Sequence, residues 1–124
     1  DLMSLYDDAG WGAYTHDSVN LAEAVRNSYY VLTAWDGDHL IGMMRVVGDG
    51  VTISYIQDIL VKKKYKRRKI GTKLLTKTLE HFKNVRQTVL LTDNKEETVG
   101  FYKAMGFEDC KEMGLISFAR INRS

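Results

Sequence analysis

The stretch that decides the fold is Val61-Lys62-Lys63-Lys64-Tyr65-Lys66-Arg67-Arg68-Lys69-Ile70-Gly71-Thr72-Lys73-Leu74-Leu75. An apolar strand leads into a dense group of cations, and an amphipathic helix then begins at about Gly71. A helix N-terminus offers unpaired backbone N–H groups and the positive end of a dipole, which together attract anions. Lysines and arginines around it add positive charge. The stretch therefore predicts a site for a ligand that carries several phosphates.

The composition is that of one soluble globular domain over residues 1–124, with 44% apolar and 27% charged residues. No apolar run is long enough to span a membrane. A single cysteine, Cys110, excludes an internal disulfide and fits a reducing cytoplasm. The helical spacing of Leu2, Leu5 and Tyr6 starts with hardly any capping residue before it, so we expect that a preceding segment, such as a strand, is missing.

The positive charge is local. Seven of the 18 lysines and arginines fall between residues 62 and 69, and the other 11 are outnumbered by 16 acidic residues. This distribution favours a defined anionic ligand, and it argues against general adhesion to nucleic acid, which needs a broad basic face. His16, His39 and His81 lack metal-ligand spacing, so we expect no metal site.

Hydrophobic periodicity and turn residues predict an α/β fold. We expect helices over 2–9, from 17 or 18 to 27, 71–82, and from 93 or 94 to 105, and strands over 29–35, 40–47, 51–61, 88–92 and 114–121. Asn94 as a helix cap would form a capping box with Glu97, and Gly106 would end that helix. The order predicts an antiparallel meander plus a central parallel pair, flanked by helices.

Two nucleotide-binding motifs can be set aside. The segment Gly71-Thr72-Lys73 lacks the G-x-x-x-x-G-K-[ST] frame of a P-loop, and no G-x-G-x-x-G follows a strand. A third pattern matches better. The strand Ile59-Leu60-Val61 leads to Lys66-Arg67-Arg68-Lys69-Ile70-Gly71, a second apolar strand follows at Val89-Leu90-Leu91, and a helix then ends in Tyr102-Lys103-Ala104-Met105-Gly106-Phe107.

This ordered set resembles the GNAT superfamily of acetyl-CoA-dependent N-acetyltransferases. The loop stands where that family has Gln/Arg-x-x-Gly-x-Gly/Ala, and the last segment matches its Tyr-x-x-x-Gly-Phe. The hairpin over residues 36–42 also resembles the family's second and third strands, so the likeness covers about residues 30–107. It implies a GNAT-like mixed sheet whose parallel strands splay, and transfer of an acetyl group from acetyl-CoA to a primary amine by direct attack.

The resemblance also implies a cofactor site. Backbone amides from Arg67 to Thr72 would hold the pyrophosphate of coenzyme A, and the pantetheine arm would pair with the strand before the loop. Lys69 stands where the family has its first glycine. A right-handed Lys69 could still point its amide at phosphate, whereas a site that needs positive φ would bind less tightly. The residues implied for the cofactor are Ile59, Leu60, Val61, Lys66, Arg67, Arg68, Lys69, Ile70, Gly71, Thr72, Asn94 and Phe101.

Tyr102 stands where the family has its general acid, and a phenol with a pKa near 10 is neutral at pH 7. A packed core tyrosine is the alternative. The attacking amine must lose a proton, and we nominate Asp58 as the base because it lies in a β-rich strand just before the cofactor-pairing residues. A structural carboxylate or a water chain remains an alternative for that step.

The acceptor amine is expected to enter beside the first two helices and the hairpin. Trp11, Tyr14 and Tyr29 are candidates for its walls or for a minor core, and Arg26 and Arg45 would meet an acceptor carboxylate or face solvent. Nothing separates a peptide amine from a small-molecule amine. Two other functions stay open: a coenzyme A sensor of the same fold without turnover, and, less favoured, nucleic-acid binding by the loop 62–69. A homodimer is compatible with so small a domain.

Overall fold

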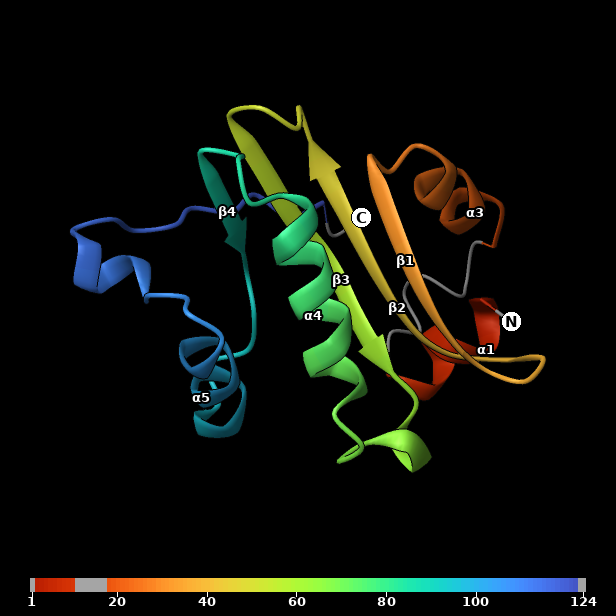
Figure 1. Cartoon of the computed structure of the whole chain (residues 1–124). Helices are drawn as coiled ribbons and strands as arrows, with labels where there is room; N and C mark the ends of the chain where they lie inside the picture. Colours follow the sequence, from red (N-terminus) through yellow and green to blue (C-terminus); the bar gives the residue numbers. More distant parts are fainter. Residues whose placement is uncertain (1, 11–17, 123–124) are drawn as a thin grey trace. The chain divides into compact units, whose positions relative to one another are not determined.

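The computed structural model describes residues 2–10 and 18–122. The chain divides into two compact units, Asp1–Leu91 and Thr92–Ser124. In its described residues the first unit holds the sheet and its covering helices, and the second holds a helix and a short 3-10 segment. Figure 1 shows the elements in chain order by colour.

The sheet lies in the first unit. Its strands are β1 (Tyr30–Asp36), β2 (His39–Gly48), β3 (Ile53–Val61) and β4 (Gln87–Leu90), in the order β1-β2-β3-β4. The first three form antiparallel pairs, and β3 pairs with β4 in parallel. The structure therefore confirms the predicted meander with one parallel pair (Figure 1).

The parallel pair is short. It runs from Ile53↔Gln87 to Ile56↔Leu90 and ends there. Strand β3 continues to Val61, which still pairs with Gly42 of β2. Beyond Ile56, the edge of β3 that faces away from β2 therefore has no strand partner among the described residues. This open edge is where the predicted splay would admit a ligand.

Helix α4 (Ile70–His81) packs on β1, β2 and β3, along one face of the sheet (Figure 1). It buries Leu74, Leu75 and Thr78. Gly42 lets it approach closely, because a Cβ on Gly42 would lie only 3.4 Å from Leu74 Cδ1. The start of α4 lies beside the end of β3. A Cβ built on Gly71 would lie 3.9 Å from Val61 Cγ2.

Helices α1 (Leu2–Asp8) and α3 (Ser18–Arg26) cover the opposite face. Because Gly42 faces α4, strand alternation turns its neighbour Met43 the other way. That side chain belongs to one buried cluster with residues of α1, α3, β2 and β3: Leu5, Tyr6, Leu21, Leu40, Met43 and Leu60. The predicted helices over 2–9 and from 17 or 18 to 27 are confirmed within their described residues.

In the second unit, α5 covers Glu96–Ala104 and η2 covers Cys110–Met113. The expected capping box is wrong: the cap of α5 is Lys95 in extended conformation, without a side-chain bond, and Asn94 lies outside the helix. The end of the helix is as predicted. Gly106 has φ +95°, a conformation that suits glycine, and it stops the helix just after Met105.

The predicted last strand over residues 114–121 is also wrong. The described residues from 115 to 122 form no strand, and Ile116 and Phe118 are 78% and 92% exposed. The segment is β-rich, but a strand exists only when its backbone pairs with another edge. The described part of the second unit contains a helix and a 3-10 segment, and neither offers such an edge.

Candidate active site

The basic loop leaves β3 through the 3-10 segment η1 (Lys63–Tyr65) and ends at Lys69, the N-cap of α4. Lys69 has φ 60° and ψ 24°, and Arg67 has φ 68°. They are the non-glycine residues with positive φ in the described chain. The position at which the related family carries glycine is therefore left-handed here, and a lysine occupies it. A side chain in this conformation is strained.

The start of α4 is open to an anion. Its first turn has no acidic residue, and Lys69 makes no side-chain cap. The amide of Lys73 bonds to Lys69 O at 3.0 Å, so the amides of Ile70, Gly71 and Thr72 come before the first helical bond. These donors and the positive end of the helix dipole directly follow the exposed cations of the loop.

Contacts with other elements hold the loop. The Lys63 amide donates to Asp8 Oδ2 of α1 at 2.7 Å, and Lys62 Nζ donates to Ser4 Oγ at 2.9 Å. The Tyr65 hydroxyl donates to Oδ2 of Asp36, the last residue of β1, at 2.6 Å. Lys62 is therefore engaged in a structural contact. The predicted phosphate-binding cations Lys66, Arg67, Arg68 and Lys69 have exposed side chains.

The three predicted cofactor-pairing residues lie next to this loop. Ile59, Leu60 and Val61 pair on one side with Met44, Met43 and Gly42 of β2. Their other side is the open edge of β3. Leu60 belongs to the core cluster under α1, while Ile59 and Val61 are half-buried. The backbone at the open edge can accept and donate hydrogen bonds to an extended ligand, as an added strand would.

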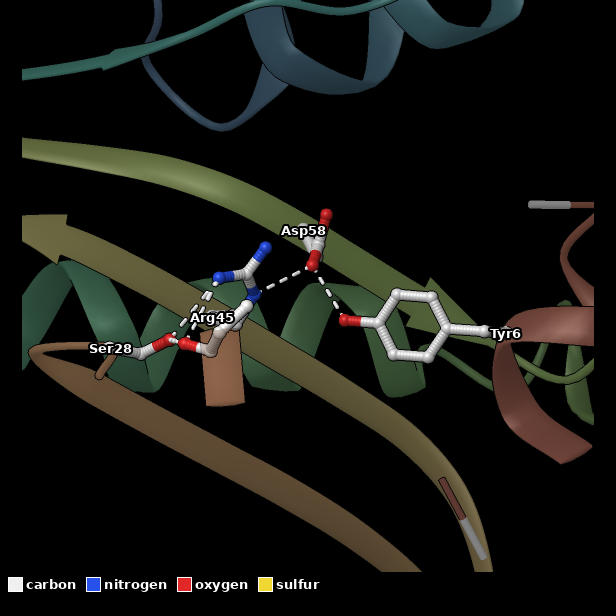
Figure 2. A network of polar contacts seen from close by, with 5 residues as sticks. Tyr6, Ser28, Arg45 and Asp58 are labelled. Carbon is white, nitrogen blue, oxygen red and sulfur yellow. Dashed lines mark hydrogen bonds and ion pairs between the residues drawn. The ribbon is translucent and has the colours of Figure 1, made fainter. Parts of the chain in front are cut away.

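Asp58 lies at the centre of a buried polar network (Figure 2). Its Oδ2 accepts hydrogen bonds from the Tyr6 hydroxyl at 2.6 Å and from Arg45 Nε at 2.8 Å. Arg45 Nη1 also donates to Ser28 Oγ at 3.3 Å and to Ala24 O at 3.5 Å. Asp58 Oδ1 is buried and has no hydrogen-bond partner in the described chain. One carboxylate thus connects α1, β2 and, through Arg45, the end of α3.

The network controls the protonation of its members. Burial and the hydrogen bond to Asp58 raise the pKa of Tyr6 well above its ordinary value of 10.0. Burial lowers the pKa of Arg45, but the hydrogen bond and charge of Asp58 outweigh it and the net shift is upward. Both donors therefore keep their protons at neutral pH, and Asp58 Oδ2 stays occupied.

The expectation for Arg45 is corrected: it is buried in an ion pair rather than facing solvent or an acceptor carboxylate. Sequence reasoning also missed Tyr6, which it placed only in a helix core. A signal was present for Arg45, because it is the one charged residue in the apolar run Leu40–Val47. A cation in a buried strand needs an anionic partner, and Asp58 directly faces it in the strand register.

Tyr102 is buried in α5 of the second unit. The helix ends in a Schellman motif: the Phe107 amide donates to Tyr102 O at 3.0 Å and the Gly106 amide donates to Lys103 O at 3.1 Å. The Tyr102 ring makes edge contacts with Phe101 at 5.1 Å and with Phe107 at 5.7 Å between centroids. Burial raises the pKa of Tyr102, so the phenol is neutral at physiological pH.

The remaining residues predicted for the site lie in different parts of the chain. Asn94 is exposed between β4 and α5, and Phe101 is half-buried in α5. Tyr29 is 56% exposed, and its ring lies 6.0 Å from that of Phe82, just after α4. Trp11 and Tyr14 lie outside the described residues. In the first unit Asp58 and the pairing residues share β3, which leads into the basic loop. In the second unit the rings of Phe101 and Tyr102 are in contact.

Comparison with known proteins decides the family. The model of the acetyltransferase (GNAT) domain matches residues 6–115, across both units. The chain belongs to the GNAT acetyltransferase family. A GNAT-family acetyltransferase from Streptococcus pneumoniae is 35% identical, with a TM-score of 0.88 over 99% of this chain and 89% of that one. The predicted fold and family are therefore confirmed.

Two further relatives are more distant. A histone acetyltransferase of Glycine max is 29% identical over 87% of this chain and 51% of its own length, so the chain spans about half of that relative. A GNAT acetyltransferase from Elizabethkingia anophelis, with acetyl-CoA bound, is 23% identical with a TM-score of 0.62 over 72% of this chain and 60% of that one. The helices of the described residues include none long and apolar enough to cross a membrane.

Proposed function

We propose that this GNAT acetyltransferase transfers the acetyl group of acetyl-CoA to a primary amine by direct attack. The observation that carries the proposal is the open N-terminus of α4, behind a left-handed, cation-rich loop and beside the unpaired edge of β3. Free amides suit a pyrophosphate, and an open strand edge suits an amide-bearing arm such as pantetheine. The acetyl-CoA bound to the Elizabethkingia relative supports the same ligand here.

The residues present fit this cosubstrate. The amides of Ile70, Gly71 and Thr72 would hold the pyrophosphate, and the exposed Lys66, Arg67, Arg68 and Lys69 would neutralise it. The backbone of Ile59 and Val61 would pair with the pantetheine arm. Asn94 and Phe101 stay proposed cofactor-binding residues, on the family resemblance alone.

The chemistry needs a proton acceptor and a proton donor. The amine must lose a proton before it attacks the thioester carbonyl carbon; a C–N bond then forms, and the C–S bond breaks to release a thiolate. Tyr102 is proposed as the donor to that thiolate. Its buried phenol keeps the proton at neutral pH, since burial raises its pKa.

Asp58 is proposed as the proton acceptor, and its geometry limits how it could act. Tyr6 and Arg45 occupy Oδ2, so Oδ1 is the oxygen left to receive a proton. The side chain is fully buried, so the proton would have to arrive through a water molecule rather than by direct contact with a bulky amine. Trp11, Tyr14 and Tyr29 remain the proposed walls for the acceptor.

The test is calorimetric titration with acetyl-CoA together with an assay of thiol release on a panel of amines. We expect micromolar binding by wild type and by Tyr102→Phe, with turnover about a hundredfold lower in the variant. Tyr30→Phe, the same change in β1, is the matched control and should keep full turnover. Equal turnover by Tyr102→Phe would remove the acid role, and no binding of acetyl-CoA would overturn the proposed function.

A second function, a coenzyme A sensor without turnover, is favoured by one observation. The nominated base is held in a buried ion pair, as a structural carboxylate would be. Under this hypothesis the protein binds acetyl-CoA and releases no thiol with any amine of the panel. Thiol release by wild type with any amine therefore excludes the sensor. In that case an Asp58→Asn variant with lower turnover and unchanged acetyl-CoA affinity supports Asp58 as the proton acceptor.

A further inference from the structure

The basic loop begins at a backbone amide that is capped from another part of the chain. Lys62 is the N-cap of η1 and makes no side-chain cap hydrogen bond, so the first amide of η1, on Lys63, needs a partner from elsewhere. Asp8, the last residue of α1, provides it, because the Lys63 amide donates to Asp8 Oδ2 at 2.7 Å. A residue 55 positions away in the sequence therefore caps the start of the loop.

Helix α1 makes a second contact with the same part of the loop. Ser4 lies one turn before Asp8, and its Oγ accepts a hydrogen bond from Lys62 Nζ at 2.9 Å. Residues one turn apart lie on the same side of a helix, so one side of α1 makes both contacts. In the sheet, the Lys62 amide donates to Ile41 O of β2 at 2.8 Å. The chain that leaves β3 is therefore held first by β2 and then by α1.

The carboxylate of Asp8 holds the loop without neutralising its side chains. It accepts from a backbone amide, and the ion pairs of the described residues include no lysine or arginine between 62 and 69. The seven cations of that stretch repel one another, and such repulsion spreads a chain over extended conformations. A carboxylate bonded to the backbone opposes this spread and leaves the cationic side chains to a ligand.

We propose that Asp8 is a positioning residue for acetyl-CoA: its cap on the Lys63 amide fixes the path of the chain from β3 to α4, and with it the amides that precede the first helical bond of α4. The inference rests on the proposed function, because it needs acetyl-CoA as the ligand of those amides.

The proposal predicts an effect on affinity that is opposite in sign to the effect of charge. Asp8 is negative and contacts a loop that is proposed to bind phosphates, so its charge alone would repel the ligand, and its removal would tighten binding. Loss of the cap would weaken binding. Asp8→Ala removes the charge and the cap together, whereas Asp8→Asn removes the charge and keeps an oxygen that accepts from the Lys63 amide.

The experiment measures the Kd of acetyl-CoA by calorimetry, and its KM and kcat by thiol release with an amine that is turned over. We expect Asp8→Ala to raise both Kd and KM about tenfold, because a hydrogen bond to a charged group is lost. The kcat at saturating acetyl-CoA should stay within about twofold of wild type, since the cap acts on binding. Asp8→Asn should bind at least as tightly as wild type.

Two further variants complete the design. Asp7→Ala removes an exposed carboxylate one position earlier in α1 and is the matched control, which should not weaken binding. Asp8→Leu keeps a branched side chain without an acceptor, and it carries the test if Asp8→Ala does not fold. Calorimetry alone decides the inference if no amine of the panel is turned over.

The outcomes separate this inference from the proposed function. If Asp8→Ala binds acetyl-CoA as tightly as wild type or more tightly, or if Asp8→Asn binds as weakly as Asp8→Ala, the inference is overturned and the cosubstrate assignment stands. A fall in kcat without a rise in KM also overturns it, because that result indicates a disturbance of α1 that reaches Tyr6 and Asp58. Failure of wild type to bind acetyl-CoA overturns both.

Discussion

Lys69 carries a full side chain in a left-handed conformation at the start of α4. In an L-residue with a Cβ this conformation costs roughly 1–2 kcal/mol, while glycine adopts it without that cost. The lysine instead adds an exposed positive charge just before Ile70, Gly71 and Thr72, whose amides precede the first helical bond. Lys69 thus exchanges stability for positive charge at the proposed anion site.

Lys69→Gly should therefore stabilise the protein by about 0.5–1 kcal/mol, the relief of strain less the larger chain entropy of unfolded glycine. Urea unfolding of wild type and variant measures the change. Lys73→Gly, one turn later in α4, is the matched control and should destabilise by about 1 kcal/mol because its position is helical. If Lys69→Gly loses stability as Lys73→Gly does, the backbone of Lys69 is not strained in the wild-type protein.

Tyr6 should make the stability of the protein depend on pH in the alkaline range. Burial and the bond to Asp58 raise its pKa above 10.0, so above that pH the unfolded chain releases a proton that the folded chain keeps. The contribution of Tyr6 to the free energy of unfolding is complete below pH 10.0. It falls as the pH rises above that value, by up to about 1.4 kcal/mol per pH unit. Tyr6→Phe removes this dependence.

Urea unfolding of both proteins between about pH 8 and 11 checks that expectation. At the lower pH the variant should be less stable by about 1–3 kcal/mol, because buried Asp58 loses a donor. Above pH 10 the difference should shrink. If the free energies of unfolding of the two proteins change in parallel with pH, Tyr6 does not release its proton on unfolding.

At the scale of elements, the sequence allowed most bounds to be predicted within a few residues. The hairpin strand expected over 40–47 is His39–Gly48, because glycines and aspartates mark its turns. The network was not predictable in the same way. Its bond from Tyr6 to Asp58 joins residues 52 apart, and a register shift between Arg45 and Val46 decides what faces Asp58. Such contacts depend on tertiary packing that no local pattern encodes.

The end of α5 is the element that positions Tyr102. Gly106 at φ +95° closes the Schellman motif, and the ring contact of Phe107 with Tyr102 accompanies it. Gly106→Ala should cost about 1–2 kcal/mol, since alanine is strained there. It should also lower thiol release by moving the phenol.

Gly100→Ala provides the control for that prediction. Gly100 lies inside α5 with open space around its Cβ position, so alanine should stabilise the helix by about 0.5–1 kcal/mol. Thermal unfolding and the thiol assay on both variants give the comparison. A Gly106→Ala variant that loses stability but keeps full turnover would show that Gly106 does not position Tyr102.

For the whole molecule, the distribution of charge decides between a compact anionic cosubstrate and a polyanion. Seven cations lie between residues 62 and 69, while the other residues carry more acids than bases. The phosphates of a small ligand such as acetyl-CoA would meet the positive charge of the loop and little of the rest of the chain. A long duplex would also come near the rest of the chain, whose 16 acidic residues outnumber its 11 lysines and arginines and would repel it.

We therefore expect acetyl-CoA to displace a fluorescent coenzyme A analogue from the protein, and short duplex DNA at equal phosphate concentration to displace little of it. Because exposed phosphate contacts are screened, acetyl-CoA affinity should fall about three- to tenfold between 50 and 500 mM NaCl. A steep, DNA-like loss of binding with salt, or efficient displacement by DNA, would favour the nucleic-acid function of the loop. A localised site binds only a few phosphates, and salt screens only the contacts with those phosphates. It therefore requires a moderate salt dependence and selective displacement by acetyl-CoA.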